Sequence, residues 1–152
     1  MGMRAPSLYT HFASKNAIYD AMFGQAWTDC LAVFESLWDQ LPSDGREALR
    51  RAARTFFDFC VQDLARHQLM NLRTIPGFEP SEAAYAPAVA VMDLTHRLFL
   101  RHGLTASQDV DLYVAVVGGL IDSQHANDPG GTRWSGLLDR AIDMLADDFT
   151  LP

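Results

Sequence analysis

The chain has little positive charge and few cysteines. Its 152 residues hold 12 Lys and Arg against 19 Asp and Glu, which gives a net charge of -7, and Lys15 is the only lysine. Because phosphate contacts need Lys and Arg, this composition argues against a protein that binds nucleic acid over a broad surface. Cys30 and Cys60 each lie within an apolar helical pattern. They are expected to be reduced core thiols rather than a disulfide or a metal site.

Long hydrophobic runs and strand-like patterns are also missing. No window approaches the roughly 18 uncharged apolar residues that a membrane span needs. Met1 is followed by a polar, proline-containing stretch, which does not match a signal peptide. The chain shows neither an internal repeat nor useful strand-like alternation, and 49% of its residues are hydrophobic, which excludes general disorder. We therefore expect a folded, cytoplasmic, all-α protein.

The sequence offers little catalytic chemistry. Its five histidines are scattered, and no glycine-rich phosphate loop or nucleophile elbow is present. Asp122 and His125 are three residues apart, a spacing that suits either a shared metal or, as we prefer, a solvent-side ion pair. We predict that the chain is not an enzyme and has no cofactor.

Apolar residues recur at intervals of three and four along most of the chain, which indicates amphipathic helices. Ser14 and the pairs Asp44/Glu47 and Thr105/Gln108 have the spacing of N-terminal helix caps. Pro87 predicts either a kink or a late helix start near Tyr85. The expected helices cover residues 14–40, 45–66, 69–73, 81–102, 105–127 and 132–149.

Two local features of these helices call for an explanation. Four arginines crowd the first two turns of the helix from residue 45, where positive charge opposes the helix dipole, so we expect them to meet acids elsewhere: Arg46, Arg50, Arg51 and Arg54. Gly118 and Gly119 interrupt another helix, and each glycine costs about 1 kcal/mol relative to alanine. Close approach of a second helix, or space for a ligand, would compensate.

The first fifteen residues carry the most specific pattern. Leu8 and Phe12 are four residues apart, and Ser14 then opens a long apolar run, which indicates a short helix, a serine cap and a long helix. This order is the second half of a helix-turn-helix. The segment closely resembles the recognition helix of the tetracycline-repressor (TetR) family, on the positions Gly2, Ser7, Leu8, Tyr9, His11, Phe12 and Lys15. Some forty residues precede this turn in the family but not here, so we expect either a truncated start or a protein that works without a complete DNA-binding head.

The resemblance implies a TetR-like helical bundle in two parts. Residues 1–40 would be a remnant of the helix-turn-helix, with its recognition helix at about 4–12, followed by the connecting helix. Residues 41–152 would form the effector-binding and dimerisation domain. If the full-length head is present, operator DNA would be contacted in the major groove by Arg4, Ala5, Ser7, Tyr9, Thr10, His11 and Lys15. The alternative for Tyr9 and His11 is that they only cover the long helix.

The same resemblance implies an effector pocket and a homodimer. A cavity for a small hydrophobic effector would be lined by Phe56, Phe57, Cys60, Phe78, Tyr85, Met92, His96 and Phe99, although such a stripe also suits plain core. The last two helices would pair with a second copy through Val114, Val117, Gly118, Ile121, Leu138, Ile142 and Leu145, with packing inside one chain as the alternative.

These expectations combine into one function and one alternative. The sequence suggests a ligand-responsive transcriptional repressor that binds operator DNA as a dimer and is released by its effector. The alternative is a ligand-binding or dimeric helical module that does not bind DNA in this truncated form.

Overall fold

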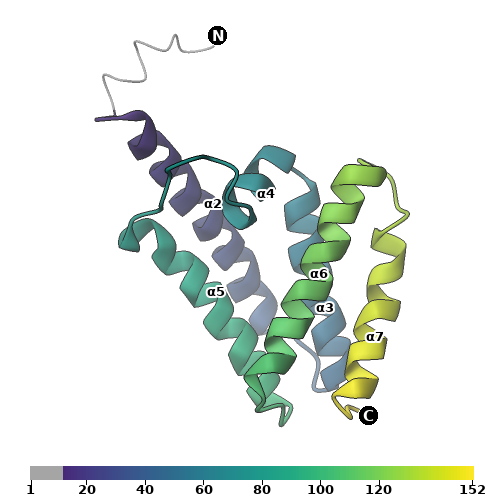
Figure 1. Cartoon of the computed structure of the whole chain (residues 1–152). Coiled ribbons are helices and arrows are strands. Elements are labelled where there is room, and N and C mark those ends of the chain that lie inside the picture. Colours follow the sequence, from purple (N-terminus) through teal and green to yellow (C-terminus); the bar gives the residue numbers. More distant parts are fainter. Residues whose placement is uncertain (1–11) are drawn as a thin grey trace.

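The structure is a computed structural model that describes residues 12–152. Within that range the chain is all-α, as predicted, with six α-helices, one 3₁₀ turn and no strand (Figure 1). The elements are α2 (Lys15–Trp38), α3 (Gly45–Val61), α4 (Leu64–Asn71), α5 (Glu82–Arg101), α6 (Ser107–Asn127), η1 (Ser135–Leu137) and α7 (Leu138–Asp148). The residues expected to contact DNA, apart from Lys15, lie outside the described range.

Short polar side chains begin most of the helices. Ser14 caps α2 by accepting a hydrogen bond from the Ala17 N–H, and Asp44 caps α3 by accepting one from the Glu47 N–H. The predicted cap at Thr105 is wrong, because α6 begins at Ser107 and has no side-chain cap. Such caps satisfy backbone donors that have no partner within the helix.

The predicted helix over 45–66 is divided in two. It ends at Val61, and α4 begins at Leu64, because the Asp63 carboxylate accepts a hydrogen bond from the Arg66 N–H and so starts a new helix. The short helix expected over 69–73 is therefore the end of α4. A side chain that bonds locally to backbone competes with helix continuation.

The last helix also begins later than predicted, at Leu138 rather than near Thr132. The Gln124 side-chain oxygen accepts hydrogen bonds of 3.0 Å from the N–H groups of Trp134 and Ser135. These bonds hold the preceding segment against the end of α6, so that segment does not join α7.

Helices α2 and α5 lie along one another, and their paired face forms one side of the molecule (Figure 1). The Asp20 carboxylate accepts hydrogen bonds from the N–H and the hydroxyl of Ser81 at the start of α5. A Cβ added at Gly24 would lie 3.3 Å from the Ala84 Cα, so the glycine permits this close approach. The helix continues through Pro87 from its start at Glu82, so the late start near Tyr85 does not occur.

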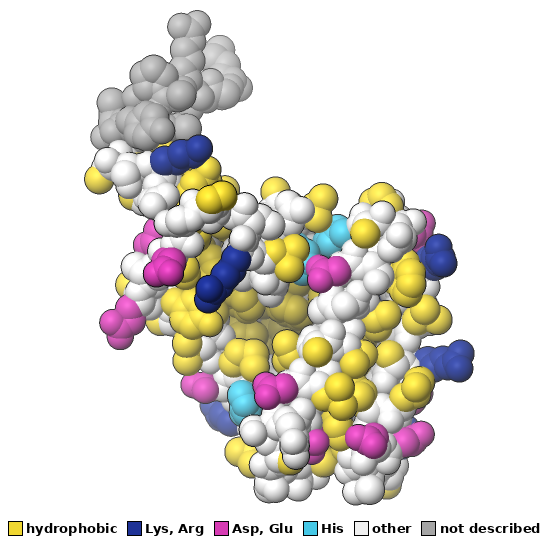
Figure 2. All heavy atoms as spheres, viewed as in Figure 1, with side chains coloured by type: hydrophobic (Ala, Val, Ile, Leu, Met, Phe, Trp, Pro, Cys, Tyr) yellow, Lys and Arg dark blue, Asp and Glu magenta, His cyan; other side chains and the backbone are white. Residues whose placement is uncertain are grey.

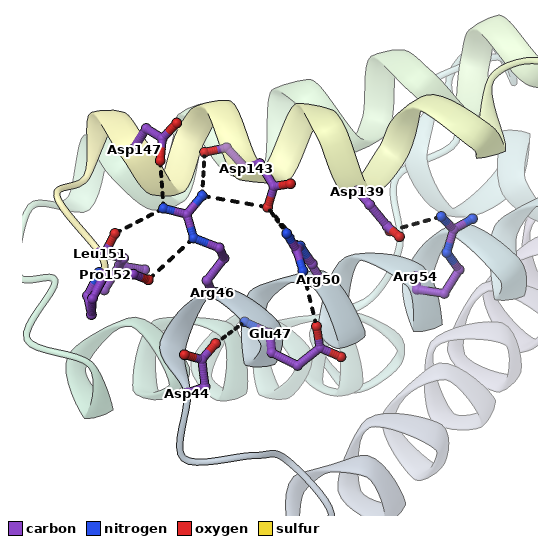
Figure 3. Close-up of polar contacts among 10 residues, drawn as sticks. All are labelled: Asp44, Arg46, Glu47, Arg50, Arg54, Asp139, Asp143, Asp147, Leu151 and Pro152. Carbon is purple, nitrogen blue, oxygen red and sulfur yellow. Dashed lines mark hydrogen bonds and ion pairs between the residues drawn. The ribbon is translucent and has the colours of Figure 1, made fainter.

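A ladder of ion pairs joins α3 to α7 on the other side of the molecule (Figure 3). The α3 arginines do meet acids, as expected from their crowding. Because they recur every four residues on facing, antiparallel helices, each meets a carboxylate one turn further along: Arg46 with Asp147 and Asp143, Arg50 with Asp143, and Arg54 with Asp139. Arg51 pairs with Glu47 on its own helix.

A single hydrophobic core lies between these two sides and draws on α2, α3, α5, α6 and α7. Its largest fully buried apolar side chains are Phe57, Phe99, Leu49, Leu98, Ile121, Leu138 and Ile142. Helix α2 contributes Phe23, Trp27 and Phe34 to this core. The long N-terminal helix is therefore part of the body of the molecule.

Candidate functional site

A cavity of about 260 Å³ opens in the core where five helices, α2 to α6, meet. Figure 2 shows this face hollowed, with hydrophobic side chains on its floor. The lining residues are Trp27, Phe34, Ala52, Ala53, Phe56, His67, Asn71, Leu72, Val91, Met92, Thr95, Tyr113, Val114, Val117, Gly118 and Asp122. A mainly apolar cavity with a few polar groups is the usual form of a small-molecule site.

Aromatic rings form one wall of the cavity. The Trp27 ring from α2 is stacked on Phe56 from α3, with 6.3 Å between ring centroids and an interplanar angle of 21°. Phe34, two turns along α2 from Trp27, meets the edge of the same Phe56 ring. The rings that connect α2 to α3 are thus also rings that a molecule in the cavity would touch.

A histidine and a carboxylate stand at the polar end of the cavity. The His67 ring of α4 is 2% exposed, and its Nε2 lies 2.7 Å from the Asp122 Oδ1 of α6. The Asn71 side-chain nitrogen is 3.2 Å from the His67 Nδ1 and 3.3 Å from the His67 carbonyl oxygen. The amide therefore donates to both acceptors, and the ring proton is assigned to Nε2, which donates it to Asp122.

His125 packs against the His67 ring. Its ring is stacked on His67, with 5.2 Å between centroids, and its Nε2 donates a hydrogen bond to the Cys60 carbonyl oxygen. Asp122 is thus paired with His67. The ion pair that the sequence suggested between Asp122 and His125 is therefore wrong. No group of three or more His, Cys, Asp or Glu side chains within residues 12–152 is placed to hold a metal ion.

One polar group of the cavity wall has no hydrogen-bond partner among the described residues. It is the indole N–H of Trp27, a side chain only 8% exposed. Buried donors are nearly always paired, and leaving one unpaired costs about 1–3 kcal/mol. Three further buried side-chain nitrogens of the described chain also have no partner, and all three lie outside the cavity lining: Arg66 Nε, His102 Nε2 and Trp134 Nε1.

The two cysteines take no part in this site as nucleophiles. Cys30 and Cys60 are free and buried, as expected, and burial raises the pKa of each thiol to about 12. A thiol with such a pKa is protonated near neutral pH and is a weak nucleophile. Burial also raises the pKa of the Tyr113 hydroxyl, which donates a 2.9 Å hydrogen bond to the Leu49 carbonyl oxygen.

The eight residues expected to bind an effector fall into four places. Phe56 and Met92 line the cavity. Phe78 and Tyr85 line a second, more polar hollow of about 650 Å³ under the segment between α4 and α5. His96 is exposed, and its Nδ1 donates to the Met92 carbonyl oxygen. The remaining three belong to the close-packed core: Phe57, Cys60 and Phe99.

The residues expected at a dimer interface are mostly used within the chain. Val117, Ile121, Leu138, Ile142 and Leu145 are buried in its own core. Their packing matches the alternative of intrachain contact, so a dimer face on α6 and α7 would have to use other residues. Val114 is 40% exposed, and Gly118 is partly exposed beside the cavity.

Sequence reasoning missed the polar end of the cavity. His67 and Asn71 are four residues apart, a spacing that places them on one helix face, but their partner Asp122 is 55 residues away from His67. In the sequence, Trp27 is one apolar residue within a long helical pattern and carries no other signal. Its missing hydrogen-bond partner is a property of the packed structure.

Lys15, the first residue of α2, is the one expected DNA contact that the structure describes. Its ammonium lies 5.7 Å from the centre of the Tyr19 ring, and its side chain is exposed. None of the described helices is long and apolar enough to cross a membrane. Comparisons with known protein families, with curated proteins and with solved structures find no match to this chain.

Proposed function

We propose that the chain is a TetR-like, ligand-responsive transcriptional regulator, a repressor that binds operator DNA as a dimer and leaves it when a small hydrophobic effector enters the cavity. The recognition-helix pattern over Gly2 to Lys15 supports the DNA-binding part. The observation that carries the regulatory part is that the cavity wall includes Trp27 and Phe34 of α2. Helix α2 directly follows the recognition-like segment.

The proposed mechanism uses α2 as the moving part. A molecule in the cavity would press on Trp27 and Phe34, and a small shift of α2 would change the distance between the two recognition helices of a dimer. Because both half-sites must be met at a fixed spacing, operator affinity would fall. Effector binding changes operator affinity only if the effector binds more tightly to the chain with α2 in one position than in the other.

A dimer would use the outward side of α6 and α7. Hydrophobic side chains gather over this side in Figure 2. Leu112 is 43% exposed, Leu137 is 41% exposed and Met144 is 65% exposed. Val116, Gly119 and Leu120 continue the same side of α6 at helical spacing. An exposed apolar patch of this kind is typical of an interaction surface.

The DNA-binding part is tested by selecting bound sequences from random double-stranded DNA with the full chain. An inverted repeat should be recovered, and affinity for it should fall in Lys15→Ala and Tyr9→Ala. Lys15→Ala should also reduce the dependence of affinity on salt, because it removes a phosphate contact. Recovery of no common sequence would favour the alternative, a ligand-binding or dimeric helical module without DNA binding.

A further inference from the structure

Some polar groups that line the cavity already form hydrogen bonds within the chain, and others remain able to bind a guest. The Thr95 hydroxyl donates a 3.0 Å hydrogen bond to the Val91 carbonyl oxygen, and the Tyr113 hydroxyl donates to Leu49. Both hydroxyl protons are therefore committed within the chain. The Asn71 amide is committed to His67.

His67 does not neutralise the Asp122 carboxylate in this arrangement. With the Asn71 amide oriented as a donor to the His67 Nδ1, the ring proton is assigned to Nε2, which donates it to Asp122. Asp122 thus gains a hydrogen-bond donor but keeps its negative charge. A protonated imidazole would have to turn an N–H toward the Asn71 amino group, which is itself a donor.

No lysine or arginine of residues 12–152 forms an ion pair with Asp122, whose carboxylate accepts a hydrogen bond from His67. Its side chain is 50% exposed, so it stands at the rim of the cavity, within reach of both water and a bound molecule. Among the described residues, the rest of the lining includes no acid, lysine or arginine. The cavity therefore combines a single uncompensated negative charge with apolar and aromatic walls.

Aromatic walls next to a carboxylate favour a positively charged guest. The faces of Trp27 and Phe56 carry negative electrostatic potential, and such faces attract ammonium groups. A carboxylate adds a charge-assisted hydrogen bond of the strong class. An anionic guest would meet repulsion from Asp122 and find no cation in the described lining.

We propose that the cavity binds a small lipophilic amine, whose ammonium pairs with the free Asp122 oxygen while its apolar body lies against Trp27, Phe34 and Phe56. This inference rests on the proposed function, because it names the chemical class of the effector at the same site. The volume of about 260 Å³ is close to the lower end of the roughly 300–1,000 Å³ usual for small-molecule sites, so the guest has one or two rings.

Three probes of one shape and different charge test the proposal. They are 2-naphthylmethylamine, 2-naphthylmethanol and 2-naphthoic acid, each titrated into the full chain at pH 7.5 by isothermal calorimetry. The amine should bind about tenfold more tightly than the alcohol, the step expected from one charged hydrogen bond. The acid should bind most weakly of the three.

A matched pair of variants then assigns the preference to one residue. Asp122→Asn keeps an oxygen that accepts from His67 but removes the charge, so the amine should fall to the affinity of the alcohol while the alcohol is unchanged. Asp111→Asn removes an exposed charge from the same helix outside the cavity lining, and should alter neither probe. Circular dichroism melting of each variant checks that both remain folded.

The results separate this inference from the proposed function. The inference is wrong if the amine binds no better than the alcohol, if Asp122→Asn leaves its affinity unchanged, or if no probe binds. A neutral probe that binds and releases DNA would leave the regulatory proposal standing. Asp122-dependent amine binding by a chain that selects no DNA sequence would instead support the inference and remove the repressor function.

Discussion

Alanine substitutions at Gly118 and Gly119 of α6 test both the stability of the helix and the position of the cavity. A Cβ added at Gly118 or at Gly119 would meet nothing within 4 Å, so alanine fits at either position of the described chain. Neither glycine has a φ in the left-handed region, so the backbone accepts a side chain. The two positions differ in one respect, because Gly118 lines the cavity and Gly119 is exposed on the outward side of α6.

Each substitution should therefore stabilise the folded chain to a similar degree. Gly→Ala within a helix is worth about 1 kcal/mol, and for a chain of this size that free energy raises the melting temperature by about 2–4 °C. The free energies of unfolding come from urea titrations followed by circular dichroism. Gly118→Ala should in addition weaken binding of 2-naphthylmethanol, because its methyl group takes up space in a cavity of about 260 Å³. Gly119→Ala should leave that binding unchanged.

Three results would refute this reasoning. Loss of stability in Gly118→Ala would mean that the space beside its Cα is filled. Equal probe binding by both variants would mean that the probe sits elsewhere. Loss of stability in Gly119→Ala alone, at a concentration where the chain is dimeric, would place a second helix close to Gly119 and restore the helix-approach interpretation of the glycine pair.

Further predictions concern the surface and the pH response. Asp143→Asn, which removes a carboxylate paired with Arg50, should cause a small loss of stability that shrinks as salt is added; an equal loss at high salt would contradict an ionic contribution. Burial, with the nearby Arg101 charge, lowers the pKa of His102 below its ordinary value, so below about pH 6.5 the unfolded chain takes up a proton that the folded chain resists. Stability should fall between pH 7.5 and 5.5, less so in His102→Asn, and parallel pH curves would contradict that assignment. Met144→Glu places a charge on a side chain that is 65% exposed, and should shift the chain from dimer to monomer in sedimentation experiments without lowering its melting temperature as a monomer.

Local sequence was sufficient to predict much of the fold. Ser14 and Asp44 cap their helices as expected because a cap needs only a side chain and an N–H three residues further on. Gly103 ends α5 with a positive φ of 79°, also a local event. The crowding of arginines at the start of α3 predicts that they pair with acidic residues. It does not predict which ones, because these acids lie about a hundred residues away on α7.

The candidate site could be predicted only in part, because its parts meet through packing. Phe56 and Met92, two of the eight residues that the resemblance implies for an effector pocket, line the cavity. Phe57 and Phe99 are also apolar residues at helical spacing, like Phe56 and Met92. Each of these two is nevertheless 1% exposed within the close-packed core. Periodicity locates the buried face of a helix but does not distinguish the part of that face that meets a neighbour from the part that borders a cavity.

The polar end of the cavity depends on one break in the helical pattern. Asp63 ends the continuous helix expected over 45–66 and starts α4, whose direction brings His67 and Asn71 to α6. Had α3 continued, the buried imidazole would need another acceptor for its proton, and Asp122 would lose the hydrogen bond that it accepts from His67. A single capping side chain thus decides whether a histidine and an amide stand beside Asp122 at the polar end of the cavity.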